Sequence, residues 1–183
     1  GESILDGHVS EISTSRYEQP MDIRGTQRVG EVSIAFEALG ERDHSWGPRD
    51  WNIGWTFMPV SRPGLRALAI RVSVDEETHM DLGYLVRDEM AHVFELDFAL
   101  TYDADVTRPF AGRARLVDEH DFAFEGRVEP ITGSEIDLSH VLDGTRRSLY
   151  RRALVRFVPD DGSAPLYGFL EVHRFLEREA AST

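Results

Sequence analysis

The sequence predicts an all-β protein folded as an antiparallel up-and-down barrel, with a β-sandwich as the alternative. Three observations support this prediction: apolar residues recur with a period of two, turn-forming residues separate them at short intervals, and about ten strands result. An open sheet of that size would leave its edges exposed, whereas closure into a barrel removes them. Periodicity alone does not distinguish a barrel from a sandwich.

Three segments show the alternation most clearly. Residues 67–74 place larger apolar side chains on one face and alanine, arginine and serine on the other, which predicts one buried face and one solvent-facing face. In residues 92–102 the even positions from His92 to Tyr102 form the apolar face. The other expected strands cover residues 32–38, 51–57, 80–86, 113–117, 122–128, 153–158 and 166–175.

Turn-forming residues separate these strands at short intervals, as in a meander. The expected turns are residues 61–64, 75–77, 87–89, 118–120 and 159–162. Helical features are confined to residues 139–148 and 176–181. An up-and-down barrel of lipocalin type commonly encloses a cavity, and we expect a ligand there.

The length of 183 residues suffices for one sizeable core, so we expect a single β-barrel domain over residues 1–183. Because the chain starts at Gly1 rather than Met, we expect the natural gene product to extend further towards the N-terminus. No uncharged run reaches the ~20 residues of a membrane helix, and the N-terminus lacks the pattern of a signal peptide. These features predict a cytoplasmic protein without a membrane span.

Composition excludes several kinds of chemistry. The net charge of −13 and the pI of about 4.9 disfavour nucleic acid as a partner. All 20 basic residues are arginine, so Schiff-base chemistry and a P-loop lysine are excluded. There is no cysteine, and the seven histidines lack metal-ligand spacing. We therefore expect neither a metal nor an organic cofactor.

Residues 40–51 concentrate chemistry-bearing side chains between two expected strands: two Trp, two Arg, two Asp, one Glu and one His. If Asp43 faced an apolar pocket, its pKa would be raised and it could act as a general acid. The adjacent His44 would point to the opposite face of an extended strand. Only one of the two would then face a cavity, unless a bulge intervenes.

The same motif has a structural interpretation. Trp46 would close one end of the barrel, and Arg42 or Arg49 would stack over its ring. Asp43 and Asp50 would then bind these arginines to the backbone. The sequence leaves the catalytic and structural interpretations open.

The last expected strand forms a second candidate site, because its odd positions carry both titratable and aromatic groups on one face. These residues are Tyr167, Phe169, Glu171, His173 and Phe175. Such a mixture suits the wall of an amphipathic pocket. In the alternative, Leu166, Leu170 and Val172 face the core, while Glu171 and His173 are simply exposed.

Several motifs within residues 17–175 carry a resemblance to a known family. They are Tyr17-Glu18-Gln19, Gly25, Gly40-Glu41-Arg42-Asp43-His44-Ser45-Trp46-Gly47-Pro48-Arg49-Asp50-Trp51 and the late Gly168-Phe169-Leu170-Glu171. With these motifs, the sequence resembles the C-terminal lipocalin-like domain of an uncharacterised bacterial family, which is distantly similar to hydroxyneurosporene synthase (a carotenoid hydratase) and tocopherol cyclase.

The resemblance implies a cofactor-independent lyase, hydratase, cyclase or isomerase that transfers a proton to a hydrophobic, isoprenoid-like or polycyclic metabolite. Asp43 would donate the proton, with His44 or Glu171 assisting. The expected ligand-binding residues are Trp46, Arg49, Trp51, Trp55, Tyr167 and His173. The alternative is a non-enzymatic carrier of a hydrophobic small molecule. Pairing with a preceding β-rich domain, or a homodimer, is the expected assembly.

Overall fold

The computed structural model describes residues 15–47, 53–73, 78–102, 109–131, 136–137, 140–141 and 146–177. These residues form twelve β-strands and no helix. They belong to two compact units, Gly1–Trp51 and Asn52–Thr183, which are described separately below. The first unit contains only two strands, which form no core of their own. The expectation of one domain over residues 1–183 stays a prediction.

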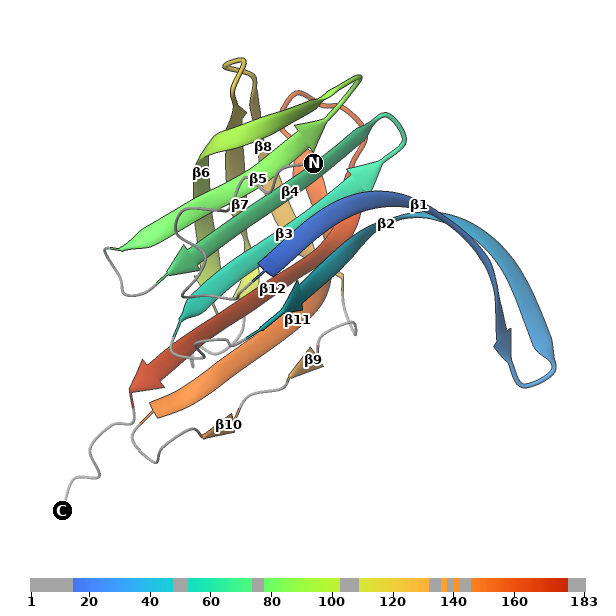
Figure 1. The fold of residues 1–183 in the computed structure, drawn as a ribbon, viewed down its shortest axis with the longest axis horizontal. Helices are drawn as coiled ribbons and strands as arrows, with labels where there is room; N and C mark the ends of the chain where they lie inside the picture. Colours follow the sequence, from blue (N-terminus) through green and yellow to red (C-terminus); the bar gives the residue numbers. More distant parts are fainter. Residues whose placement is uncertain are drawn as a thin grey trace. The chain divides into compact units, whose positions relative to one another are not determined.

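Eight strands of the second unit close into an antiparallel barrel (Figure 1). They are β3 (Gly54–Arg62), β4 (Leu65–Ser73), β5 (His79–Val86), β6 (Met90–Tyr102), β7 (Pro109–Asp118), β8 (Ala123–Pro130), β11 (Arg146–Pro159) and β12 (Leu166–Glu177). Strands β3 to β8 pair in sequence order, β8 pairs with β11, and β12 returns to pair with β3. The predicted all-β, up-and-down, lipocalin-like barrel is thereby confirmed over the sandwich.

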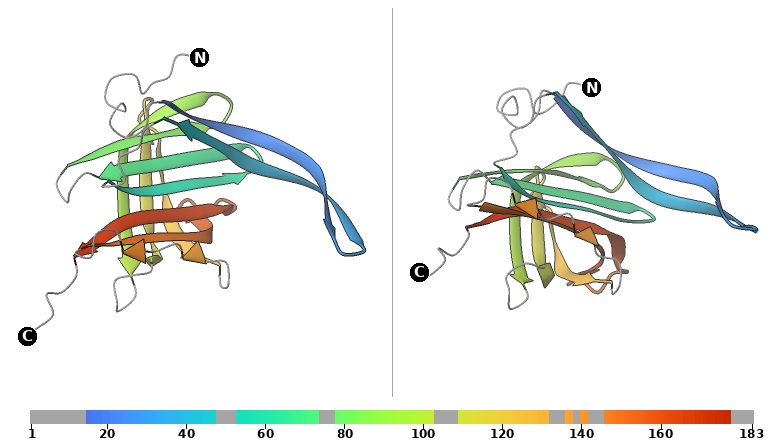
Figure 2. Two further views of the ribbon diagram at one scale, coloured as in Figure 1. Left: turned by 60° about the horizontal axis from the view of Figure 1, so that its bottom comes forward. Right: turned by 90° about the horizontal axis from the view of Figure 1, so that it is seen from below.

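Two short strands, β9 (Ile136–Asp137) and β10 (His140–Val141), pair with β11 outside this ring (Figure 2). The segments with helical features are therefore extended wherever the structure describes them, at residues 140–141, 146–148 and 176–177. Four of the five expected turns connect strands as predicted, and residues 75–77 lie outside the described part of the chain.

The interior of the barrel is lined by the small-residue face of β4, not by its large apolar face. Ala67 and Ala69 are fully buried and pack with Met58 and Leu116 in the main core. The expectation that this alanine face meets solvent is wrong. The two alanines leave room in the interior for larger side chains such as Met58 and Leu116. The larger Leu68, Ile70 and Val72 lie on the outer face, where they are also buried.

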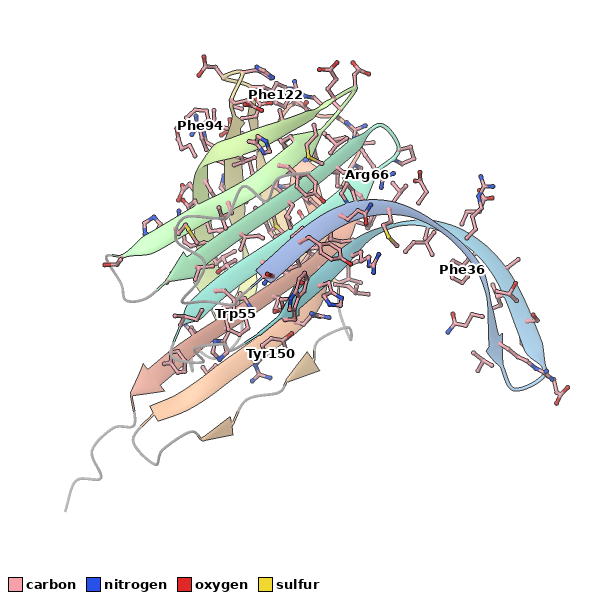
Figure 3. All side chains as sticks on the ribbon, in the orientation of Figure 1. Phe36, Trp55, Arg66, Phe94, Phe122 and Tyr150 are labelled. Carbon is pink, nitrogen blue, oxygen red and sulfur yellow. The ribbon has the colours of Figure 1, made fainter. Side chains whose placement is uncertain are left out.

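A bulge reverses the alternation of β6. The register with β7 shifts between Val93 and Glu95, so both Val93 and Leu96 are buried in the core. Phe94, expected on the apolar face, is exposed on the outside (Figure 3). The expected pattern holds at Leu96 and beyond, because one inserted residue moves each preceding side chain to the other face.

An arginine and an aromatic ring close one end of the barrel, where the turns between β5 and β6 and between β7 and β8 meet. The guanidinium carbon of Arg87 lies 4.0 Å from the centre of the Phe122 ring, which packs against the core. Arg87 Nη2 also donates a 2.6 Å hydrogen bond to the buried carboxylate of Asp118. Trp46, expected at such a position, belongs to the other unit and is 51% exposed, and its role in closing the barrel stays a prediction.

The first unit contains a two-stranded hairpin of β1 (Ser15–Val29) and β2 (Val32–Trp46), paired along their whole length. Gly30 has a φ of +58° in the two-residue turn, a conformation that glycine adopts without strain. The sequence predicted only part of β2 and missed β1, whose residues are mostly polar.

Candidate functional site

The register of the hairpin brings carboxyl groups together at its base. Cross-strand partners lie on one face, and Glu18 is directly opposite Asp43. Arg16 Nε is paired with Glu18 Oε1, and Arg16 Nη2 lies 3.3 Å from Asp43 Oδ2. Glu41 belongs to the same face, opposite Pro20. We call Arg16, Glu18, Glu41 and Asp43 the carboxylate cluster.

The Glu18 side chain is only 9% exposed, and its Oε2 atom has no hydrogen-bond partner in the described part of the chain. Burial raises the pKa of Glu18 to about 8, with Asp43 and Glu41 adding to the rise and Arg16 opposing it. Three carboxyl groups around one guanidinium would carry excess negative charge if all were ionised, so holding one proton is favourable. Glu18 is therefore mostly protonated at neutral pH.

Aromatic side chains occupy the opposite face of the same segment. The rings of Tyr17 and His44 stack with centroids 5.5 Å apart, and Trp46 contacts His44 edge-on at 5.2 Å. Arg42 lies over Tyr17, not over Trp46 as one interpretation expected. Asp43 and His44 thus point to opposite faces, as an extended strand predicts, and they do not converge on one reacting atom.

A second cluster spans three barrel strands on the outer face, and Figure 3 shows two of its members, Trp55 and Tyr150, side by side. Trp55 Nε1 donates a 2.7 Å hydrogen bond to Oε1 of Glu171. Arg152 Nε donates a 2.9 Å bond to the other oxygen, Oε2. Both oxygens of Glu171 therefore accept bonds from side chains of the barrel itself.

Histidine and tyrosine complete this Trp55–Glu171 cluster. His173 Nδ1 lies 2.9 Å from the carbonyl oxygen of Ile53, which only accepts, so Nδ1 carries the hydrogen. The His173 ring stacks on Trp55 at 4.0 Å. Burial, together with a hydrogen bond to Glu171, raises the pKa of Tyr150 to about 12. Tyr150 thus keeps its proton at neutral pH.

The barrel interior holds one bidentate ion pair. Arg71 donates hydrogen bonds of 2.7 and 2.8 Å to the two oxygens of Asp81, its partner across β4 and β5. A third bond of 2.6 Å runs from Arg71 Nη2 to the carbonyl oxygen of Leu96. Hydrogen bonding to Asp81 raises the pKa of Arg71 further above its usual range. These bonds tie three strands together and give the pair a structural role.

The structure separates the residues that the sequence put forward. Trp55, Glu171 and His173 lie together, whereas Tyr167 is exposed farther along β12. Glu171 and His173 are only 8% and 4% exposed, so the alternative that placed them in solvent is wrong. Asp43, His44 and Trp46 belong to the hairpin, and Arg49 and Trp51 lie outside the described residues.

Sequence reasoning missed four residues of these clusters: Arg16, Glu18, Tyr150 and Arg152. Glu18 stood in one of the resembling motifs, but nothing local distinguished it from the many other acidic residues. Arg152 meets Glu171 only through the pairing of β11 with β12. Within the described ranges, no three His, Asp or Glu side chains are grouped to hold a metal ion.

Among the residues with a described structure, no helix is long and apolar enough to cross a membrane.

Comparison with known proteins identifies the family but no function. No curated protein and no solved structure matches the chain. One family model matches residues 4–175, nearly the whole length, and is described as a domain of unknown function (DUF7064). The chain therefore belongs to the DUF7064 family.

Proposed function

We propose that this protein is a cofactor-independent acid–base catalyst, namely a lyase, hydratase, cyclase or isomerase, that acts on a hydrophobic, isoprenoid-like or polycyclic metabolite. The observation that carries the proposal is the Glu18–Asp43 pair, in which two carboxyl groups share Arg16 and burial raises the pKa of Glu18 to about 8. Pairs of carboxyl groups with separated pKa values divide the roles of acid and base between them.

The pair supports specific roles. Glu18 donates its proton from Oε2 to one carbon of a double bond, leaving a cationic centre on the other carbon. In an isomerisation, Asp43 then removes a proton from a carbon next to the cation. In a cyclisation, a second double bond of the substrate first attacks the cation and closes the ring, and Asp43 removes a proton next to the new cation; in a hydration, Asp43 takes a proton from water as the water oxygen bonds to the cation. The proton then passes from Asp43 back to Glu18, which restores the pair. Arg16 orients both carboxyl groups. In this proposal Glu18, rather than Asp43, is the proton donor.

The hydrophobic character of the substrate has two supports. One is the resemblance to carotenoid hydratases and tocopherol cyclase. The other is the burial of Glu18, because a water-filled site would not keep its pKa raised. Binding roles for Trp46, Arg49, Trp51, Trp55, Tyr167 and His173 stay predictions.

Deuterium incorporation tests the proposal. A panel of isoprenoid alkenes, retinoids and polycyclic precursors is incubated with the protein in D₂O, and products are analysed by mass spectrometry. We expect the wild type to incorporate deuterium into the product of one panel member. Turnover should fall by roughly 10²-fold or more in Glu18→Gln and should be normal in Glu37→Gln. Glu37 is a matched control because it lies on the same hairpin, exposed and paired with Arg24. Turnover that Glu18→Gln leaves unchanged would refute the assignment.

The second candidate is a non-enzymatic binding module for a hydrophobic small molecule. The Trp55–Glu171 cluster favours it, because both carboxylate oxygens of Glu171 accept hydrogen bonds from Trp55 and Arg152. Glu171 then has a structural role and does not assist proton transfer. In that case a retinoid would quench tryptophan fluorescence with saturation, while no member of the panel would be turned over.

A further inference from the structure

The part of the hairpin beyond its base carries large apolar side chains on one face. The register places Val29 beside Val32, Ile34 beside Gln27 and Phe36 beside Gly25, all on one side. The four large side chains are strongly exposed: Val29 62%, Val32 59%, Ile34 52% and Phe36 39%. Contiguous exposed apolar residues of this kind mark interaction surfaces. We call Val29, Val32, Ile34 and Phe36 the hairpin apolar face.

Two glycines on this side of the hairpin lie beneath side chains of the opposite strand. A Cβ atom at Gly25 would lie 3.0 Å from the tip of the Phe36 ring, so the ring extends across the strand over the glycine. Ile23 lies over Gly40 in the same way, since a Cβ there would collide with its Cδ1 atom. The apolar side chains thereby form a continuous surface across both strands, which suits packing of one sheet on another.

The charges of the hairpin favour a partner that is itself nearly neutral. Arg24 pairs with Glu37 at 3.2 Å, and Arg28 lies 3.8 Å from Glu31. Residues 22–39 contain two arginines and three acidic residues, whereas the whole chain has a net charge of −13. Residues 22–39 of two copies can therefore approach each other with little of the repulsion that the rest of the chain would cause. The apolar face carries no charge that an acidic or basic partner could recognise.

We propose that the hairpin apolar face packs against the same face of a second copy of this chain, forming a homodimer. A two-fold axis makes the contact self-complementary, because the same residues serve both partners. The two copies bury the exposed apolar surface of a hairpin that is only marginally stable by itself. Four large side chains make a small interface, so the dimer forms in the micromolar range of concentration.

Sedimentation velocity across micromolar concentrations tests the dimer. We expect the wild-type mass to double as concentration rises, Ile34→Glu to stay monomeric, and Ser33→Glu to dimerise like the wild type. Ser33 is the matched control because it is exposed on the opposite face of the same strand and receives the same charge. A monomeric wild type, or an assembly that Ile34→Glu does not dissociate, would overturn the proposal.

Cross-linking supplies a second readout that needs no disruptive change. Because the chain has no cysteine, a single introduced thiol gives one reactive site per copy. We expect a short bismaleimide to link two copies through Gln27→Cys, on the apolar side, and to leave Thr26→Cys, on the opposite side, unlinked. Equal linking of both variants contradicts the proposed face. Circular dichroism of each variant confirms that the barrel is folded.

Discussion

Trp55 Nε1 donates a hydrogen bond of 2.7 Å to Oε1 of Glu171, although 116 residues separate the two in the chain. The contact exists because β12 returns to pair with β3, which brings His173 opposite Trp55 and Glu171 opposite Phe57. Closure of the barrel thus creates the polar cluster on its outer face. The contact also ties β3 to β12 at the seam of the barrel.

Replacing Trp55 with Phe should destabilise the protein by roughly 1–3 kcal/mol, because Glu171 Oε1 stays buried without its donor. Denaturant unfolding followed by circular dichroism measures the change. Tyr167→Phe, an exposed position on β12, should alter stability by less than about 0.5 kcal/mol. Equal stability of Trp55→Phe and the wild type would show that the indole bond is energetically neutral.

Asp118→Asn tests the closed end of the barrel. Asp118 is fully buried and accepts bonds from Arg87 and from the backbone N–H groups of His120 and Phe122. Removing the charge of Asp118 should lower the free energy of unfolding by roughly 3 kcal/mol, as measured by denaturant unfolding, since Arg87 loses its partner. Asp160→Asn is the control, because Asp160 pairs with Arg113 near solvent and should cost less than about 1 kcal/mol. Similar losses in both variants would argue against a special role for the buried pair.

The raised pKa of Glu18 predicts a pH dependence of defined sign. Because the pKa rises from 4.5 to about 8 on folding, the proton stabilises the folded state fully below about pH 4.5. This contribution is lost as the pH rises through about 8. Carbon-13 NMR should follow the Glu18 carboxyl to a midpoint near 8, and Glu18→Gln should remove the dependence. A midpoint near 4.5 would eliminate Glu18 as an acid at neutral pH.

Gly168→Ala should destabilise the barrel more than any exposed glycine substitution. A Cβ atom at Gly168 would collide with the carbonyl oxygen of Pro59 on β3, so the seam between β12 and β3 would have to open. We expect a loss of several kcal/mol or failure to fold. Gly30→Ala, which meets no atom within 4 Å but has a φ of +58°, should cost only about 1–2 kcal/mol. Thermal unfolding of both variants checks the order.

Local patterns in the sequence were enough to predict the all-β class and most strand positions. Alternation in residues 67–74 and 166–175 marked strands, and Pro63-Gly64 marked a turn, because period-two patterning and turn chemistry are local properties. The opposite orientation of Asp43 and His44 followed from their adjacency in a strand. Alternation likewise put Leu166, Leu170 and Val172 on one face of the last strand, and one of the two interpretations placed that face in the core.

Tertiary structure alone decided which face of each strand was inside and which charged groups met. Ala69 lines the interior, where it leaves room for Met58 and Leu116, and Phe94 is outside because a bulge shifts β6. Glu18 became the candidate acid because pairing of β1 with β2 sets it against Asp43 and burial raises its pKa. Such effects depend on strand register and solvent exclusion, and both are set by residues far apart in the chain.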